Sequence, residues 1–216
     1  MELESIKQIA AENMENRSSH SWKEPGNKFF HGERVAKLTL MLRKIVLPED
    51  NTHDDILTVA AWFHDVRNGE EEHCEKGAQT TQELLNGICN SKELKEICEI
   101  IALHDNRTEQ HHAYSDYVKL HQDADLLDHF GSYDVWMHFA YASAHNQTLQ
   151  QMADYLKNVR PAEDQRYLNE LNFSVSKAIY LEKSNFLKQF TERFCAERSG
   201  EIWNFEQVLS GMVQRE

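Results

Sequence analysis

The sequence predicts an all-α protein with one packed core. Glycine and proline are scarce, 8 and 3 among 216 residues, which argues against sandwiches and barrels built on tight turns. Hydrophobic residues make up 40% of the chain and recur mainly at the three- and four-residue spacing of helices. This length fits one generous domain, so we expect residues 1–216 to form a single helical bundle.

Nine segments show this helical spacing. In chain order they are 1–16, 28–45, 54–65, 73–86, 91–104, 115–129, 131–159, 163–196 and 201–213. Turn-forming residues separate several of them, namely Pro25-Gly26, Pro48, Gly87, Arg160-Pro161 and Ser199-Gly200. No internal repeat or low-complexity tract interrupts this pattern.

Composition excludes several classes of partner. The formal net charge of -13 repels polyanions, so we expect no extended nucleic-acid binding, although a small phosphorylated ligand could be neutralised locally. No run of about 18 apolar residues could span a membrane, and the N-terminus lacks a secretory pattern. The cysteines form no C-x-x-C pair and suggest neither disulfides nor a thiolate zinc site. We therefore expect a reduced, cytoplasmic protein. The four cysteines are Cys74, Cys89, Cys98 and Cys195.

Three helices carry ionisable residues on faces that should point inward. The segment Ala60-Ala61-Trp62-Phe63 is apolar and ends in His64-Asp65, where ionisable groups must be paired, hydrogen-bonded or bound to a metal. His31 lies on the apolar stripe of its helix, and Asp125 lies on that of the 115–129 helix. Two imidazoles and two carboxylates suit borderline or hard divalent ions. Such an ion could activate water and polarise phosphorus.

These residues resemble the H…HD…D pattern of the HD superfamily of metal-dependent phosphohydrolases. The matching residues are His31, His64-Asp65, and Asp125 within Asp123-Ala124-Asp125-Leu126-Leu127-Asp128. The small single-domain bacterial HD proteins are most similar, since they also carry an I-x-x-H element, here Ile101-Ala102-Leu103-His104. The resemblance covers about residues 28–145, and the helices of about 146–216 look like accessory helices of that group.

The resemblance implies an HD-domain bundle that holds a divalent ion (Mn, Fe, Ni, Co, Zn or Mg) through His31, His64, Asp65 and Asp125. It implies hydrolysis of phosphate esters or anhydrides, frequently on nucleotides, with Asp65 orienting or deprotonating the attacking water. Two departures concern the substrate. Leu126 stands where the group often has arginine, and Lys23–Phe30 adds residues before His31.

Each of the flanking residues has more than one role that fits the sequence. Arg34 could bind a phosphate or pair with Asp128 or Glu33. His104 could contact substrate, support the ligands, ligate a second metal or be purely structural. Three other groups are expected to have ordinary roles: Lys76 and Arg107 as surface charges, Glu70–Glu72 as a solvated loop that could still orient water, and Trp62, Tyr133 and Trp136 as core or pocket wall.

Three alternatives to the hydrolase are also compatible with the sequence. A di-iron oxygenase on the same scaffold would need His104 and either His121 or His129 beside Asp65. A non-catalytic module could use the pocket to sense a ligand. A ferritin-like di-iron site would use Glu70-x-x-His73 and Glu109-x-x-His112, but both lie in polar stretches. A homodimer is possible through one apolar face of the long C-terminal helix, formed by Ile179, Phe186, Leu187 and Phe190.

Overall fold

The computed structural model describes residues 1–17, 20, 22–107 and 113–213, and it confirms the all-α expectation. Within these residues there is no strand, only an isolated bridge between Asn86 and Cys89. The helices are α1 (Leu3–Met14), α2 (Asn27–Val46), α3 (Asp54–Phe63), α4 (His73–Leu85), α5 (Ser91–Leu103), α6 (Asp116–Asp128), α7 (Ser132–Ala144), α8 (Leu149–Asp154), a π-helical turn (Tyr155–Val159), a 3-10 turn (Arg160–Glu163), α9 (Asp164–Glu170), α10 (Ser174–Arg198) and α11 (Phe205–Val213).

The helix expected over 131–159 is broken in two. α7 ends at Ala144, and Asn146 adopts a left-handed backbone with φ 53° that a helix cannot continue. Thr148 then starts α8 through a capping box, in which its side chain and that of Gln151 satisfy each other's backbone N–H groups. The polar residues 145–148 interrupt the apolar spacing only briefly, so periodicity alone missed this break.

The helix expected over 163–196 is also interrupted, for a reason remote in sequence. α9 ends at Glu170, and the backbone N–H groups of Asn172 and Phe173 donate to the Asp123 carboxylate at 2.8 and 3.0 Å. Asp123 is buried in α6, so these bonds anchor the start of α10 to the N-terminal half. The chain leaves the helix because a buried carboxylate needs these donors.

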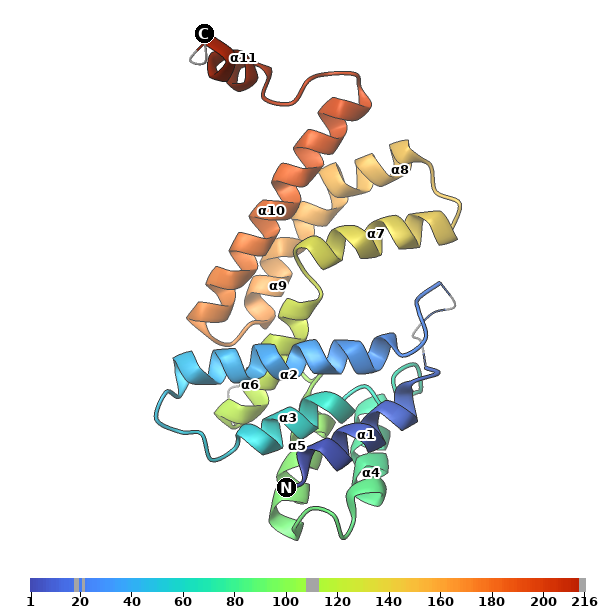
Figure 1. The fold of residues 1–216 in the computed structure, drawn as a ribbon, viewed down its shortest axis with the longest axis vertical. Coiled ribbons are helices and arrows are strands. Elements are labelled where there is room, and N and C mark those ends of the chain that lie inside the picture. Colours follow the sequence, from blue (N-terminus) through green and yellow to red (C-terminus); the bar gives the residue numbers. More distant parts are fainter. Residues whose placement is uncertain (18–19, 21, 108–112, 214–216) are drawn as a thin grey trace.

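Helices α1–α6 form the half of the molecule that contains the main hydrophobic core. α2 runs across α3 and α6, and α4 packs along α5 (Figure 1). The centre of the core includes fully buried side chains from all six of these helices and from α10. The largest are Ile6, Met14, Leu42, Leu57, Phe63, Leu85, Ile97, Ile101, Leu120, Leu127 and Tyr180.

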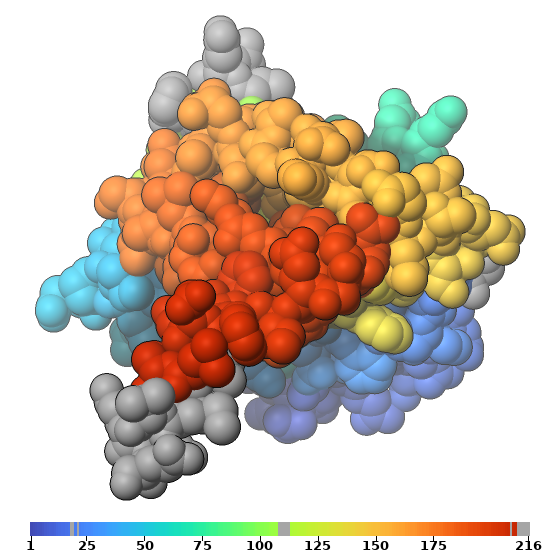
Figure 2. All heavy atoms as spheres, turned by 90° about the horizontal axis from the view of Figure 1, so that it is seen from above, coloured from blue at the N-terminus to red at the C-terminus, as the bar shows by residue number. Residues whose placement is uncertain are grey.

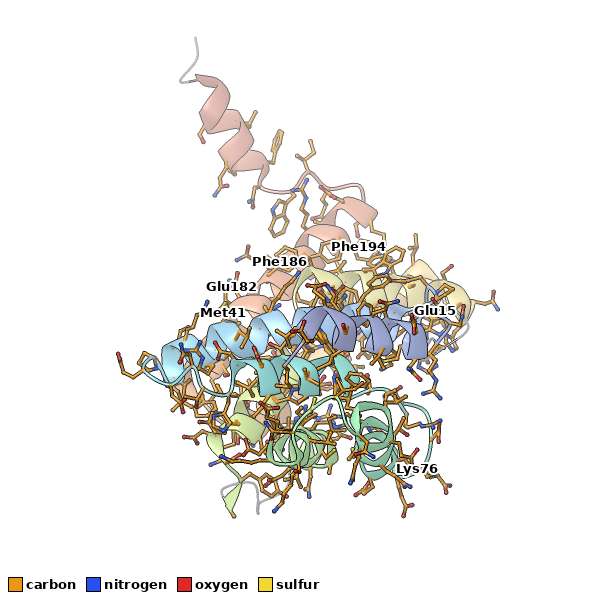
Figure 3. The ribbon with its side chains drawn as sticks, turned by 60° about the horizontal axis from the view of Figure 1, so that its bottom comes forward. Glu15, Met41, Lys76, Glu182, Phe186 and Phe194 are labelled. Atoms are coloured by element: carbon orange, nitrogen blue, oxygen red, sulfur yellow. The ribbon has the colours of Figure 1, made fainter. Side chains whose placement is uncertain are left out.

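Helices α7–α10 cover one end of this half. Seen from that end they form one continuous face, with the N-terminal helices behind it (Figure 2). A second, smaller cluster of buried residues holds them together, formed by Ala142, Met152, Leu156 and Leu187. Phe194 of α10, labelled in Figure 3, packs against Phe139 with ring centroids 5.3 Å apart. Leu187, on the apolar face for which a dimer contact was one possibility, is therefore buried within the chain, whereas Phe186 is 43% exposed.

Of the aromatic residues expected in the core or pocket wall, some are buried and one is exposed. Trp62 is buried in α3, and Tyr133 lies 4.5 Å from the Arg34 guanidinium. Trp136 is 60% exposed on α7, so its assignment to the core or pocket wall is wrong. On a helix that packs against the protein on one side only, apolar spacing does not show which apolar residues are buried. None of the helices in the described ranges combines the length and the apolar composition needed to cross a membrane.

Candidate metal centre

A close crossing of α2 and α3 brings two histidines together. Gly32 is buried in α2 directly after His31. A Cβ atom at Gly32 would lie 2.7 Å from the carbonyl oxygen of Ala61 and 3.2 Å from Cα of Trp62, so a larger residue would push the helices apart. With glycine there, the rings of His31 and His64 lie 5.0 Å apart between centroids. Gly32 carries no chemistry, so no sequence motif marks it.

The four residues matched to H…HD…D converge in one buried cluster. His64 follows the last residue of α3, Asp65 lies in the turn after it, and α6 supplies Asp125. His31 Nε2 lies 3.0 Å from Asp125 Oδ1 and 4.0 Å from Asp65 Oδ2. His64 Nε2 lies 3.7 Å from Asp65 Oδ2 and 3.5 Å from Asp125 Oδ1. These separations are close to the 3 to 3.5 Å, roughly, between neighbouring ligand atoms around an ion with bonds of about 2.1 Å.

The orientation of His64 suits a metal ligand. Its Nδ1 lies 2.8 Å from the carbonyl oxygen of Ala61 and therefore donates to it, which leaves Nε2 as an acceptor. Nε2 is buried and has no hydrogen-bond partner among the described residues. An unpaired buried acceptor is costly, and a cation among two imidazoles and two carboxylates would satisfy it. The donor set and its geometry therefore fit a divalent ion.

Two cationic side chains contact the carboxylates of the cluster. Lys28 Nζ binds Asp65 Oδ2, and Arg107 Nη2 donates to Asp125 Oδ2 at 2.8 Å. Both cationic side chains are 12% exposed. Arg107 is therefore part of this site, and its assignment to the ordinary surface charges is wrong. Lys28 belongs to the Lys23–Phe30 segment, the additional residues before His31.

Mutual contacts keep the cluster charged. Burial raises the pKa of Asp65, but the charges of Lys28 and His31 outweigh it and hold that pKa well below its usual range. Burial also opposes ionisation of Asp125, whose pKa is nevertheless held far below normal by its hydrogen bond with His31 and by the charge of Arg107. Burial lowers the pKa of His31, but hydrogen bonds to Asp125 and Asp128 raise it overall to about 9. Both carboxylates are therefore anionic at neutral pH.

Asp128 and Arg34 lie behind His31. Asp128 Oδ2 lies 2.7 Å from His31 Nδ1, which directs Nε2 toward Asp125. Arg34 binds the same carboxylate through two nitrogens, with Nε 2.9 Å from Oδ1 and Nη2 2.8 Å from Oδ2. Of the two roles considered for Arg34, the structure shows the ion pair with Asp128. Carboxylate–histidine contacts of this kind orient metal-binding imidazoles.

Further histidines surround His64. The rings of His104 and His121 lie 5.0 and 5.1 Å from its ring, between centroids. Burial lowers the pKa of His104 to about 4, and that of His121 well below its ordinary value, so both are neutral. Among the described residues, three sets of three ligand atoms lie close together. They are His31 with His64 and Asp65, His31 with Asp125 and His129, and His73 with Cys74 and His104. The di-iron alternative needs His104 together with His121 or His129 beside Asp65. None of these groups contains that combination.

The turn after His64 supports Asp65. Asn68, which sequence reasoning missed, donates from Nδ2 to Asp65 Oδ1 at 2.9 Å. Glu70 lies outside the cluster and pairs with Arg17 at 3.1 Å, so Glu70 does not combine with His73 in a ferritin-like site. The second such motif, Glu109-x-x-His112, lies outside the described residues. Asn68 could have been selected only by its position three residues after Asp65.

Comparisons with known proteins show which solved structures have a similar fold. No family model and no curated protein matches the chain. An HD-superfamily hydrolase from Bacillus thuringiensis is 22% identical, with 92% of this chain and 97% of that chain covered and a TM-score of 0.64. A predicted HD-superfamily hydrolase from an uncultured Thermotogales bacterium is 20% identical, with 90% and 91% covered and a TM-score of 0.60. Bacillus subtilis YpgQ in complex with ADP is 18% identical, with 88% and 92% covered and a TM-score of 0.60.

These solved structures match nearly the whole length of the chain, at identities that speak for the fold alone. The all-helical arrangement agrees with the resemblance carried by His31, His64-Asp65 and Asp125. The chain therefore has the fold of the HD-superfamily hydrolases.

Proposed function

We propose that the protein is a metal-dependent phosphohydrolase that acts on a small phosphorylated metabolite, a nucleotide. The observation that carries this proposal is the buried cluster of His31, His64, Asp65 and Asp125, whose His64 Nε2 has no hydrogen-bond partner among the described residues. We assign these four side chains as ligands of one divalent ion. When bound, such an ion would acidify water and polarise a phosphoryl group.

Asp65 has the geometry to orient the attacking water. Its Oδ1 accepts a hydrogen bond from Asn68, and Oδ2 contacts Lys28, so the carboxylate is held in place. Its low pKa keeps it anionic at every physiological pH. A carboxylate this acidic is a weak base but a constant hydrogen-bond acceptor. We therefore assign Asp65 mainly to positioning the water.

Lys28 and Arg107 are suited to bind the phosphoryl oxygens. They approach the cluster from different segments, one contacting Asp65 and the other Asp125. Arg107 also has a spare donor, because its Nε is buried without a partner among the described residues. Charge-assisted hydrogen bonds from such cations are the strong contacts that phosphate groups require. They also explain how a protein with a net charge of -13 could bind an anion.

A nearby pocket suits the rest of a nucleotide. Its volume is about 420 Å³, within the range of small-molecule sites, and its walls include Trp22, His138, Tyr141 and Tyr155. Lys23 connects the pocket with the cluster. Its Nζ lies 5.3 Å from the centre of the Trp22 ring, and burial and the charge of Lys28 lower its pKa.

Asp65 also acts on Lys23, in the opposite direction, by raising its pKa. Lys23 therefore lies within electrostatic reach of the cluster as well as beside the Trp22 ring. Flat aromatic walls favour a nucleobase. The ADP complex of the structurally similar YpgQ supports a nucleotide ligand.

A substrate screen tests the function. Purified protein is incubated with nucleoside mono-, di- and triphosphates and sugar phosphates, with Mn²⁺, Co²⁺, Ni²⁺ or Mg²⁺. We expect metal-dependent release of phosphate or pyrophosphate from a nucleotide, loss of activity in Asp65→Asn, and normal activity in Asp55→Asn. Asp55 is a matched control because it is a carboxylate on α3, the helix that precedes Asp65, and is half exposed. Full metal binding without hydrolysis of any compound would contradict the proposal.

A further inference from the structure

A second group of metal-binding side chains includes His104, whose ring lies 5.0 Å from that of His64 between centroids. His73, Cys74 and His104 each offer one ligand atom, and the three atoms lie within 4.8 Å of one another. Cys74 Sγ lies 3.4 Å from His73 Nε2, and the rings of His73 and His104 lie 5.3 Å apart between centroids. The function proposed above uses none of these three residues.

Two helix ends bring the group together. His73 and Cys74 open α4, and His104 directly follows α5, along which α4 packs. Glu72, the residue before α4, has a φ of 56°, which is unusual for a residue other than glycine. Strained backbone of this kind persists only where the surroundings hold it, and it is concentrated at functional sites. Here it sets the direction in which His73 and Cys74 enter the helix.

His104 is oriented in the same way as His64. Its Nδ1 lies 2.7 Å from the carbonyl oxygen of Ile101 and donates to it, so Nε2 is the nitrogen left to accept. No contact from the described residues satisfies Nε2 with a hydrogen bond, and His104 is 3% exposed. A buried imidazole with one nitrogen fixed by a backbone carbonyl is the arrangement that metal-binding histidines adopt.

We propose that His73, Cys74 and His104 bind a transition-metal ion of the Zn²⁺ or Co²⁺ class, at a site separate from the carboxylate-rich centre. Two imidazoles and a thiolate suit these softer ions, whereas the His31 cluster, with its two carboxylates, suits harder ions such as Mn²⁺ or Mg²⁺. Three protein ligands leave a position open for water or another small ligand. No C-x-x-C pair marks the site, because its ligands come from two helices.

Ion binding at this site requires loss of the Cys74 proton. Burial, with a contribution from Asp105, raises the pKa of the free thiol to about 11, so the thiol is protonated at neutral pH. A bound ion would replace that proton, because the ligand form of cysteine is the thiolate. Binding should therefore release protons to the solvent.

Cobalt spectroscopy tests the site without any assay of hydrolysis. Full-length protein is stripped of metal and titrated with Co²⁺, and thiolate-to-cobalt charge transfer is followed in the near ultraviolet. We expect a band in the wild type that Zn²⁺ abolishes by displacement. The band should be lost in Cys74→Ser and kept in Cys98→Ser, a matched control because Cys98 is also half-buried and lies in the neighbouring helix α5.

The result can be separated from failure of the phosphohydrolase proposal. Asp65→Asn should keep the thiolate band although it removes a ligand of the other centre. His73→Ala keeps the thiol, and Co²⁺ affinity measured from the thiolate band should fall by about tenfold or more. This variant tests the site even if Cys74→Ser does not fold. The proposal is overturned if the wild type shows no band, if the band survives in Cys74→Ser, or if it is lost in Cys98→Ser.

Discussion

His31 Nδ1 lies 2.7 Å from Asp128 Oδ2, and this contact directs the opposite ring nitrogen into the carboxylate cluster. Arg34 holds the same carboxylate through two nitrogens, so Asp128 is fixed on both sides. Asp128 therefore orients the His31 ring from its Nδ1 side, while Nε2 on the other side contacts Asp125. The side chains behind the ligands are as much a part of this centre as the ligands themselves.

Asp128→Asn should weaken binding of Mn²⁺ by about 10- to 100-fold, because the amide keeps the shape but loses the charge that orients His31. Isothermal titration of the metal-free protein measures the change. Asp134→Asn is the matched control, since Asp134 is buried and pairs with Arg160 and His138 away from the centre. Equal Mn²⁺ affinities in the wild type and Asp128→Asn would show that this contact does not support ligation.

Gly32→Ala should destabilise the protein by about 1–3 kcal/mol, because its Cβ would lie 2.7 Å from the carbonyl oxygen of Ala61. It should also weaken metal binding, since the crossing of α2 and α3 sets the distance between His31 and His64. Urea unfolding measures the stability. Gly77→Ala is the control, because a Cβ there meets neighbours only at 3.4 Å or more, so this variant should be as stable as the wild type or more so.

Lys28→Met should have opposite effects on the two ligands of the site. Removal of the cation beside Asp65 takes away repulsion of the metal, so Mn²⁺ should bind more tightly. Loss of a charge-assisted contact to phosphate should raise KM for the nucleotide about tenfold. Lys76→Met, on α4 at the periphery of the molecule (Figure 3), should change neither value. Weaker binding of both ligands in Lys28→Met would indicate a structural role instead.

The stability of the metal-free protein should fall as the pH rises from 6.5 to about 9. His31 keeps its proton in the folded state up to about pH 9, whereas the unfolded chain loses it near 6.5, so the contribution of His31 to stability is lost across this window. Saturating Mn²⁺ should remove the loss, because the ion takes the place of the proton. Urea midpoints with EDTA or with Mn²⁺ measure both curves. A flat curve with EDTA between these pH values would contradict the assignment.

The same urea midpoints should also fall at acidic pH, which gives the stability curve an acid limb. Burial lowers the pKa of His104 to about 4, so its neutral form stabilises the fold above pH 6.5, and this contribution is lost as the pH falls toward 4. His121, whose two ring nitrogens are buried without partners in the described part of the chain, acts in the same direction. His121→Leu should therefore flatten this limb. An unchanged limb in that variant would exclude His121 as its source.

The sequence was sufficient to predict the local features of the centre. Helical spacing up to Phe63 predicts that His64 and Asp65 stand at the end of a buried helix, and the structure places them there. It also predicts inward faces for His31 and Asp125, which are buried. These predictions succeeded because each depends on the periodicity of a single helix.

The remaining features depend on contacts between distant segments. Arg107 follows α5 in a polar stretch, and only the packing of α5 and α6 brings it to Asp125. The break before α10 depends on Asp123, about fifty residues earlier in the chain. Gly32 matters because another helix lies against it. No single-segment pattern contains such information, because each contact has a partner elsewhere in the fold.

A crystal structure of the protein grown with Mn²⁺, with anomalous diffraction recorded at the manganese absorption edge, tests the central assignment most directly. We expect an anomalous peak about 2.0 to 2.2 Å from His31 Nε2, from His64 Nε2 and from one oxygen of each of Asp65 and Asp125. Anomalous density that avoids these four atoms, while they remain in contact with one another and with Lys28 and Arg107, would contradict it.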